Sequence, residues 1–466
     1  MNKTKLIATI GPGCDNIKTL QALVNHGVSC FRVNLSHGTM DEKEKYFKLI
    51  RSLDLHAGLR PAILADLAGP KIRVRRLQEE INLKKDDSII ISSNKKGSNV
   101  LQVSKGIEFE KVKPGAKILI DDGRVTLEVK KRLSFDTLDC VSLSDGKIED
   151  RKGVNFPGIE INVPVLTKQD ELDLMLSLSN KADWIALSFV RSPSDYHLIK
   201  EKITLAGYTT PVMAKIEKWE AVKNLEAIID SFDAVMVARG DLGVEMPIEK
   251  VPLIQKKVVE TAARFGKPAV IATQILDSMI DRPVPTRAEV SDIANAILDG
   301  TDALMVTGET AVGKHPEKVI EVLSRVIEET ESSIKYKKYK NKAIKIDTAN
   351  AISHAACMIT RRQDINILVT MTHSGSTARM CAKHRPSAKI IAMTPFKKIC
   401  RRLLIVWGVI PIVVENYNSA DEIPELAKKE LRINEWIKKS EDFVITGGVP
   451  VGISGTTNYL TILKGF

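Results

Sequence analysis

The sequence predicts an α/β protein built on a parallel (β/α)₈ TIM barrel, with an inserted small β-barrel lid domain and a C-terminal three-layer α/β domain. Two observations support this fold class. Short β-branched runs alternate with helix-period stretches eight times, and one long interval after the third run breaks the rhythm. Beyond a basic segment, strand-like and helix-like stretches alternate again, which predicts the C-terminal domain.

The apolar runs are the expected barrel strands. They are Lys5 to Ile10, Cys30 to Leu35, Ala62 to Leu67, Trp184 to Phe189, Pro211 to Ile216, Ala234 to Ala238, Ala269 to Thr273 and Ala303 to Thr307. In a barrel of this kind the carboxyl ends of all strands meet at one face, and active sites lie there. We therefore expect functional residues just at or after the end of each run.

Residues 70–167 are expected to form the inserted β-domain, which divides the barrel into residues 1–69 and 168–340. Short alternating runs and turn signals support it, namely Ser88 to Ser92, Lys117 to Ile120, Arg124 to Lys130, Asp122-Gly123 and Asp145-Gly146. The insertion follows the end of the third barrel strand, so it is well placed to act as a lid.

Residues 341–466 are expected to form the C-terminal domain, after a linker in the basic run Lys335 to Lys342. Its predicted strands are Ile365 to Met371, Lys389 to Met393, Val409 to Val414 and Asp442 to Thr446. Two small polar loops, Thr372 to Thr377 and Gly452 to Thr457, follow strands. Backbone N–H groups and hydroxyls ahead of a helix can hold a phosphate, so the loops are a candidate anion site.

Composition bounds the function. The chain has 466 residues, of which 44% are hydrophobic. No apolar stretch is long enough to span a bilayer, so we expect a soluble cytoplasmic protein with no membrane partner. The net charge of +11 fits nucleic acid, anionic small-molecule substrates or only a solvated lysine-rich surface. Because aromatics are only 5% and no nucleic-acid module is recognisable, no nucleic acid is expected. The six cysteines lack metal-ligand spacing and are expected to be reduced and mostly buried.

Polar residues gather at the predicted strand ends. They are Arg32, Asn34, Ser36, Asp66, Lys215, Glu217, Arg239, Asp241, Thr273, Thr307 and Glu309. Glu217 and Asp241, after adjacent strands, supply hard oxygen ligands for Mg²⁺ or Mn²⁺. Lys215 lies two residues before Glu217, so both side chains point the same way and the ammonium can neutralise a transferring phosphoryl group.

Two rival interpretations of these segments are disfavoured by neighbouring residues. Schiff-base chemistry at Lys215 is disfavoured, because adjacent carboxylates hold the amine protonated. The run Gly308 to Lys314 matches the start of a P-loop, but His315 stands where the Mg²⁺-binding hydroxyl should be and the preceding strand belongs to the barrel. A separate observation concerns Gly240, which follows Arg239. A glycine at this position leaves room for the backbone amides at the start of a helix to hold a substrate carboxylate.

These segments together resemble the pyruvate kinase family, over essentially the full chain and in the family's order. The matching stretches are Thr9 to Pro12, Phe31 to Gly38, Asp66 to Arg73, Ala214 to Glu217, Met236 to Glu245, Ala272 to Gln274, Pro285 to Glu289 and Gly308 to Ala311. The resemblance implies the last step of glycolysis: transfer of the phosphoryl group of phosphoenolpyruvate to ADP, giving ATP and pyruvate.

The resemblance also implies residue roles. Arg32 and Arg73 match arginines contacting the phosphoryl group and nucleotide, and Lys215 matches the lysine that stabilises the transition state. Glu217 and Asp241 match the Mg²⁺ ligands. The remaining matches are Gly240, Asp241 and Thr273 on the substrate, Thr273 and Thr307 in proton transfer, and Asn34, His37, Arg73 and Lys168 on the nucleotide.

The sequence departs from the commonest family pattern at the monovalent-cation site. Many members have Asp-Thr-Lys-Gly-Pro-Glu and bind K⁺ near residues matching Asn34, Ser36, Asp66 and the Thr; here the Thr is Leu67 and the Glu is Lys71. Leu67 removes a hydroxyl ligand, and a fixed ammonium at Lys71 supplies the missing charge. We therefore expect a vestigial site and an activity that does not require K⁺.

Regulation and assembly follow from the resemblance alone. The loop of Thr372, Ser374, Gly375, Ser376 and Thr377 resembles the family's effector phosphate loop, and a sugar bisphosphate, a sugar monophosphate and AMP all remain open as effectors. A homotetramer is expected. Gly13-Cys14 replaces the usual Ala-Ser, which we expect to alter only local packing; oxidation of a thiol near the nucleotide is the alternative.

Two other functional classes stay open on sequence grounds. One is a barrel aldolase or lyase acting on phosphoenolpyruvate or an oxo-acid, which would generally lack the inserted domain and the nucleotide-side residues Arg32, Asn34, His37 and Arg73. The other is a non-enzymatic binder of sugar phosphates or nucleic acid that has kept the fold. ATP formation separates the first class from a kinase.

Overall fold

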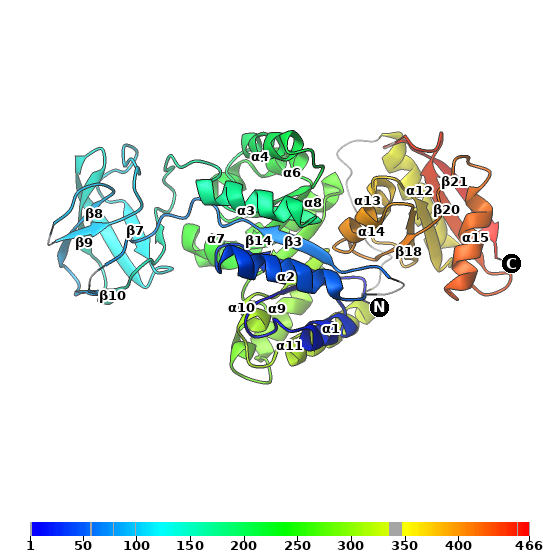
Figure 1. Ribbon diagram of the computed structural model, residues 1–466, viewed down its shortest axis with the longest axis horizontal. Coiled ribbons are helices and arrows are strands. Elements are labelled where there is room, and N and C mark those ends of the chain that lie inside the picture. Colours follow the sequence, from blue (N-terminus) through cyan, green and yellow to red (C-terminus); the bar gives the residue numbers. More distant parts are fainter. Residues whose placement is uncertain are drawn as a thin grey trace.

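The computed structural model describes residues 2–55, 58–77, 79–97, 99–334, 347–453 and 455–465. Three parts lie in a row along its longest axis, with the inserted domain at one end, the barrel in the middle and the C-terminal domain at the other end (Figure 1). The basic run predicted as a linker, and with it the predicted boundary at residues 340 and 341, lies outside the described residues.

The apolar runs form a closed barrel of parallel strands, as predicted. The strands are β1 (Lys5–Thr9), β2 (Val28–Asn34), β3 (Ala62–Asp66), β12 (Trp184–Leu187), β13 (Val212–Ile216), β14 (Ala234–Ala238), β15 (Ala269–Ala272) and β16 (Ala303–Met305). Their hydrogen-bonded order is β1-β16-β15-β14-β13-β12-β3-β2, and β1 pairs with β2 to close the ring. The strands are almost entirely buried, because helices cover the outside and side chains fill the inside.

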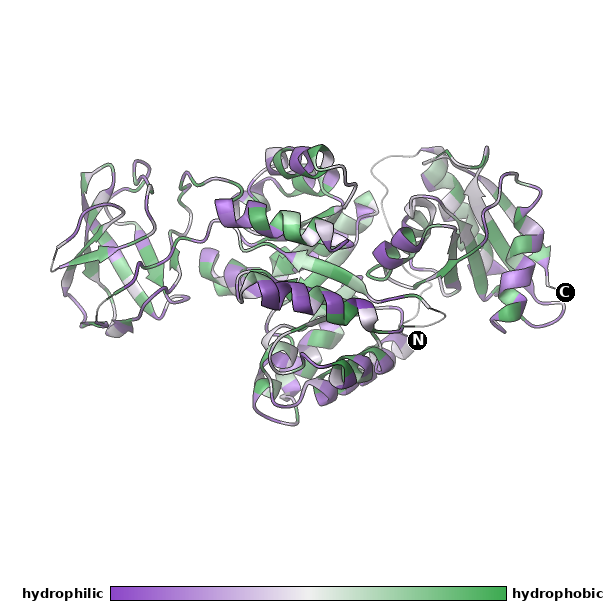
Figure 2. Ribbon diagram, viewed as in Figure 1, coloured by the Kyte–Doolittle hydropathy of each residue, from purple (hydrophilic) through white to green (hydrophobic). Residues whose placement is uncertain are grey.

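Helices surround the barrel, and hydrophilic and hydrophobic residues alternate along them, whereas the barrel strands are mainly hydrophobic (Figure 2). They are α1 (Ile17–Asn25), α2 (Met40–Ser52), α3 (Lys168–Ser179), α4 (Pro193–Leu205), α5 (Trp219–Lys223), α6 (Leu225–Ser231), α7 (Arg239–Glu245), α8 (Val251–Phe265), α9 (Arg287–Leu298), α10 (Gly308–Ala311) and α11 (Pro316–Ser333). Capping boxes at Thr39, Thr167 and Thr286 fix where α2, α3 and α9 begin.

The inserted domain has its own sheet and its own core. Its strands are β4 (Ile81–Leu83), β5 (Ser88–Ser92), β6 (Val100–Gln102), β7 (Lys117–Ile120), β8 (Val125–Ser134), β9 (Thr137–Ser142), β10 (Gly146–Ile148) and β11 (Val154–Asn155). Six of them form a sheet in the order β11-β7-β8-β9-β5-β6, and β4 pairs with β10. Inside, the rings of Phe109 and Phe156 lie 5.5 Å apart.

One buried carboxylate ties together the two connections between the barrel and the insertion. Asp170 accepts hydrogen bonds from the backbone N–H of Gly69 at 3.0 Å and of Thr167 at 2.8 Å. The chain leaves the barrel at Gly69 and returns at Thr167, so Asp170 fixes the base of the insertion beside the end of β3. This places the insertion at the face where the barrel strands end.

The C-terminal domain is a sheet covered by helices on both faces. It contains α12 (Thr348–Arg362), β17 (Ile367–Met371), α13 (Ser376–Ala382), β18 (Lys389–Thr394), α14 (Lys397–Leu403), β19 (Val409–Val413), α15 (Ile423–Ile433), β20 (Asp442–Gly448) and β21 (Thr457–Lys464). The order is β19-β18-β17-β20-β21, and β21 runs antiparallel to β20. Among the described residues, no helix has the length and hydropathy to cross a bilayer.

One expectation about this domain is wrong. The loop Gly452 to Thr457 does not precede a helix, because the chain goes directly into β21 at Thr457. The segment Thr457 to Lys464 is rich in β-branched, aromatic and leucine residues but has no strict alternation, and this antiparallel strand was not predicted. The first loop does precede a helix, α13.

Candidate active site

Lys215, near the end of β13, lies at the centre of the charged residues on the strand-end face. Its Nζ donates to Ser188 Oγ at 2.8 Å and pairs with Asp66 Oδ1 at 3.2 Å and Glu217 Oε1 at 2.9 Å. Only 11% of the lysine side chain is exposed. The predicted cation and two of the predicted carboxylates therefore meet at one point.

The surroundings of Lys215 keep its amine charged. Burial by itself lowers the pKa of a lysine, but the negative charges of Asp66 and Glu217 more than offset it, so the pKa of Lys215 lies above its usual value. A permanently protonated ammonium is a poor nucleophile and a good partner for an anion. The geometry thus favours charge stabilisation over Schiff-base chemistry.

A second cation lies beside the first. Arg32 on β2 donates from Nε to Asp66 Oδ2 at 2.7 Å and from Nη1 to Thr9 Oγ1 at 3.3 Å. Burial alone raises the pKa of Asp66, but Lys215 and Arg32 outweigh it and hold that pKa below its usual value. Asp66 is therefore an anchor for two cations, and Arg32 keeps further N–H groups for an incoming anion.

Glu217 and Asp241 follow adjacent strands, β13 and β14, and influence each other. Burial raises the pKa of Glu217; Lys215 opposes this effect and Asp241 adds to it. The backbone N–H of Phe189 donates to Glu217 Oε2 at 2.8 Å and orients the carboxylate. Two neighbouring carboxylates that repel each other at a buried site fit a hard divalent cation.

Glu217 and Asp241 are a pair of carboxylates rather than part of a larger ligand cluster among the residues that the structure describes. In the described part of the chain, no three His, Cys, Asp or Glu side chains are grouped so that they could hold a metal ion. A cation at Glu217 and Asp241 would therefore take its other ligands from water and from a substrate, which is the usual manner of Mg²⁺. The donor chemistry fits the predicted metal.

Asp241 has an unexpected partner. Lys71, at the start of the insertion, donates from Nζ to Asp241 Oδ1 at 3.1 Å. The sequence predicted that this ammonium serves the site of Asn34, Ser36 and Asp66, and no contact of Lys71 with any of these is found in the described residues. In this structure the charge of Lys71 lies on the predicted divalent-metal ligand instead.

Thr273, directly after β15, is held in a strained conformation. Its φ is +67°, a left-handed value that is costly for a β-branched residue, and Gln274 follows at +53°. The guanidinium of Arg239 donates to the carbonyl oxygens of Thr273 at 2.9 Å and of Gln274 at 2.8 Å, and pairs with Asp292. Arg239 thus holds the loop.

The strained turn aims the Thr273 hydroxyl at the start of α7. Its Oγ1 accepts from the backbone N–H of Gly240 at 2.9 Å and donates to the Ala272 carbonyl at 2.6 Å. The predicted substrate residues Gly240, Asp241 and Thr273 therefore lie together. Strain of this kind is concentrated at functional sites, where the surrounding structure holds it.

Thr307, after β16, is positioned by Glu309. Its backbone N–H donates to Glu309 Oε2 at 2.6 Å and its hydroxyl to the same atom at 3.2 Å, while Glu309 Oε1 accepts from the N–H of Leu276. The buried Glu309 thereby links the turns after β15 and β16. This link brings the loops of Thr273 and Thr307 under one constraint.

The predicted nucleotide residues are less organised. Asn34 and Asp66 are partners in the register of β2 and β3, and Asn34 Oδ1 accepts from the N–H of Ser36 at 3.1 Å. His37 and Lys168 are exposed, and Arg73 donates to the Arg151 carbonyl within the insertion. No contact in the described residues joins these exposed side chains to Lys215 or Arg32.

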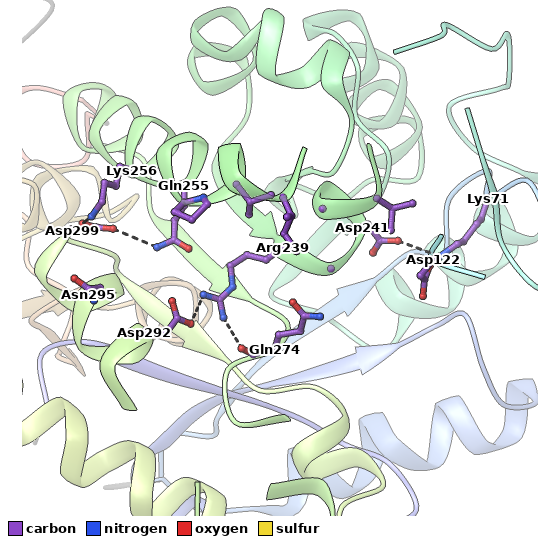
Figure 3. Close-up of a pocket in the computed structure, with 16 residues that line it drawn as sticks. Lys71, Asp122, Arg239, Asp241, Gln255, Lys256, Gln274, Asp292, Asn295 and Asp299 are labelled. Atoms are coloured by element: carbon purple, nitrogen blue, oxygen red, sulfur yellow. Dashed lines mark hydrogen bonds and ion pairs between the residues drawn. The ribbon is translucent and has the colours of Figure 1, made fainter. Parts of the chain in front are cut away.

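A cavity of about 650 Å³ opens beside the site, between the insertion and the barrel (Figure 3). Lys71 and Asp241 point toward each other on one side of it, and Arg239 lies between Asp292 and Gln274. Asp122 of the insertion also lines it. The cavity is large enough for a small-molecule ligand, and charged side chains of both the insertion and the barrel line it.

Two site residues were missed by sequence reasoning. Ser188 donates to the Leu67 carbonyl at 2.7 Å and accepts from Lys215, so it orients the lysine. Phe189 orients Glu217 through its backbone N–H. Ser188 carried a usable signal, because it is the polar residue at the end of the run Trp184 to Phe189; the Phe189 contact is made by backbone and has none.

The two polar loops of the C-terminal domain lie side by side. Residues of both line one small cavity together with Tyr417. The hydroxyls of Thr377 and Thr457 are 2.9 Å apart, and the N–H of Gly375 donates to Thr372 Oγ1 at 2.9 Å. Of the predicted anion residues, Thr372, Ser374 and Thr377 line this hollow, and Gly375 contacts it through its hydrogen bond to Thr372.

Comparisons with known proteins agree over the whole chain. The family model described as pyruvate kinase, barrel domain, matches residues 1–320, and that described as pyruvate kinase, alpha/beta domain, matches residues 350–463. The chain is 40% identical to a pyruvate kinase of Thermotoga maritima over 470 residues, covering 100% of both chains. It is 39% identical to pyruvate kinase 2 of Synechocystis sp. over 469 residues, covering 99% of this chain and 79% of that protein.

A solved structure agrees as well. The crystal structure of a pyruvate kinase from Cryptosporidium parvum superposes with a TM-score of 0.92 at 32% identity, covering 99% of this chain and 96% of that one. Because the match includes barrel, insertion and C-terminal domain, the similarity concerns the complete domain arrangement.

Proposed function

The chain belongs to the pyruvate kinase family and is a kinase, and from this premise we propose that it transfers the phosphoryl group of phosphoenolpyruvate to ADP, giving ATP and pyruvate. The observation that carries the proposal is the buried Lys215 ammonium, held charged between Asp66 and Glu217 beside Arg32. Fixed positive charge beside a cation site is what phosphoryl transfer requires.

The chain's own residues divide the work. Lys215 and Arg32 bind the phosphoryl oxygens and stabilise the charge that spreads over them. Glu217 and Asp241 would hold Mg²⁺ or Mn²⁺, which when bound polarises substrate oxygens and screens charge. Thr273 and the amide-bearing turn at Gly240 orient the substrate carboxylate.

The remaining assignments concern the proton and the nucleotide. Thr273 and Thr307 lie in loops linked by Glu309, and we assign them to the path by which the enolate carbon gains its proton. Asn34, His37, Arg73 and Lys168 are assigned to ADP, and the last two would approach it when the insertion, residues 70–167, closes over the barrel.

ATP formation tests the reaction. With Mg²⁺, the chain should form ATP and pyruvate in equal amounts from phosphoenolpyruvate and ADP. Pyruvate is followed by coupling it to NADH oxidation, and ATP is measured separately. Glu217→Gln should raise the Mg²⁺ requirement sharply. Consumption of phosphoenolpyruvate without ATP would favour the aldolase or lyase class, and no turnover at all would favour the non-enzymatic binder.

Activity without K⁺ is a separate part of the proposal. Leu67 offers no hydroxyl, and the Lys71 side chain, which carries an ammonium group, is 25% exposed and therefore able to change partners. To serve Asp66 it would have to leave Asp241. Rates with Na⁺ or a tetraalkylammonium ion in place of K⁺ should be comparable; a hundredfold drop would refute this part, and Lys71→Glu should create a K⁺ requirement.

Regulation and assembly complete the proposal. We assign the hollow around Thr372, Ser374, Gly375, Ser376 and Thr377 to a phosphorylated effector, to be tested by thermal shift with fructose bisphosphate, a sugar monophosphate and AMP.

A cytoplasmic homotetramer is proposed. Large apolar side chains exposed around α8 and α9 support an interface, namely Ile248, Leu253 and Leu298. Light scattering would give the mass in solution.

A further inference from the structure

We propose that Lys71 is a built-in competitor for the divalent-cation site, so that a cation binds the substrate-free chain only by displacing the Lys71 ammonium from Asp241. This rests on the proposed function in one respect, the role of Asp241 as a metal ligand. It adds that the insertion itself guards that ligand.

The ion pair between Lys71 and Asp241 is weak enough for a divalent cation to replace it. The Lys71 Nζ lies 3.1 Å from Asp241 Oδ1, and the two side chains are 25% and 30% exposed. An ion pair that is partly in water is weak, so a divalent cation can replace it. By comparison, the Lys215 pair with Glu217 is almost fully buried. Each predicted metal ligand thus has its own ammonium, but only one of the two is easily removed.

The insertion is shaped to let Lys71 reach Asp241. A Cβ on Gly153 would lie 2.9 Å from Lys71 Cε and 3.7 Å from Nζ, so the lysine stem passes where a side chain would stand. Gly153 is not among the residues with left-handed φ, so its backbone conformation does not call for glycine. A Cβ at this position would push the flexible end of Lys71 aside, so a side chain at residue 153 would disturb the contact with Asp241.

Other cations around the cavity have other partners. Arg239 pairs with Asp292, and Lys256, at a different part of the same cavity, pairs with Asp299 (Figure 3). Lys256 is therefore a matched control, since removing it changes the charge of the cavity without touching Asp241. Gly153→Ala is the complementary variant, since it keeps every charge and crowds the Lys71 stem.

The experiment measures Mn²⁺ binding to the full chain without substrate, from the electron paramagnetic resonance signal of free Mn²⁺. Removing the competitor in Lys71→Met should tighten binding by about two- to fivefold, the range expected for a partly exposed pair. Gly153→Ala should act in the same direction. Lys256→Met should have a smaller effect than Lys71→Met, and Lys71→Arg should stay close to the unmodified chain. Thermal melting checks that each variant folds.

The outcomes separate this inference from the function beneath it. Asp241→Asn should abolish or strongly weaken Mn²⁺ binding. If it does so while Lys71→Met or Gly153→Ala binds no more tightly than the unmodified chain, the competitor role alone is overturned. An equal gain in Lys256→Met and Lys71→Met would also overturn it, because general charge would then explain the gain. Unchanged binding in Asp241→Asn would overturn the metal assignment itself.

Discussion

Replacing Lys215 by Met tests the central assignment, because the change removes the charge and keeps the length of the side chain. Lys215 contacts Ser188, Asp66 and Glu217 and is 11% exposed. Removing one donor from a preorganised, water-poor site typically costs about 10²–10³ in kcat. Lys215 carries a full charge, so we expect a loss of about a thousandfold or more in ATP formation.

The same substitution has a cost in stability that the structure also bounds. Removing one partner of a buried ion pair costs about 3–5 kcal/mol, because the other charge is left unpaired. Here Arg32 still pairs with Asp66, so Glu217 is the carboxylate most affected. The loss should therefore fall at the lower end of that range, measured as the free energy of unfolding in urea.

Two readouts separate chemistry from folding. In Lys215→Met, exchange of the pyruvate methyl protons in heavy water, followed by NMR, should persist while ATP formation is lost, because the lysine is assigned to the phosphoryl group. Lys215→Arg keeps a cation and is the matched control for charge. ATP formation by folded Lys215→Met within about tenfold of the unmodified chain, a difference of only about 1.4 kcal/mol, would refute the assignment.

Three further predictions follow from single contacts. Thr273→Ser should retain most activity and Thr273→Ala should lose about a hundredfold in kcat, since only the first keeps the hydroxyl that holds the Gly240 amide; equal rates would contradict this role. All six cysteines are buried, and burial raises the pKa of Cys14 to about 11. The native chain should therefore have no thiol that reacts rapidly with a thiol reagent at pH 8, and the unfolded chain should have six. Burial lowers the pKa of His384 from 6.5 to about 3, so the folded state resists protonation of this side chain. The contribution of neutral His384 to the free energy of unfolding should be fully present above pH 6.5 and decline as the pH falls toward 3, by at most about 1.4 kcal/mol per pH unit. In denaturant titrations, His384→Asn should make the free energy of unfolding less dependent on pH over this range.

The barrel was predictable because its signal is redundant. Each parallel strand is buried on both faces and reads as a short apolar run, and the eight runs reinforce one another. The insertion was recognised from the gap in that rhythm, but most of its strands were not, because strands such as β4, β10 and β11 have only two or three residues. Strands of that length carry no usable period.

The site was predictable to the extent that it depends on residue type at strand ends. Lys215, Glu217 and Asp66 meet as expected, because alternation and strand position determine where their side chains point. Ser188 was missed although it is the polar residue at the end of a predicted strand, because a hydroxyl carries no charge, and the N–H of Phe189 is a backbone donor with no signal in the residue type. The left-handed turn at Thr273 and Gln274 was also invisible, because nothing in the residue types suggests positive φ.

Lys71 shows where residue type stops being enough. The sequence predicts that a lysine at this position supplies a positive charge, and the structure contains that charge, but its partner is Asp241 rather than Asp66. The position lies just after Gly69, where the chain enters the insertion, so its surroundings depend on how the insertion sits. One ammonium cannot serve both carboxylates at full strength. If Lys71 serves Asp66 during turnover, closure of the insertion must exchange its partner, and the same movement frees Asp241 for the cation.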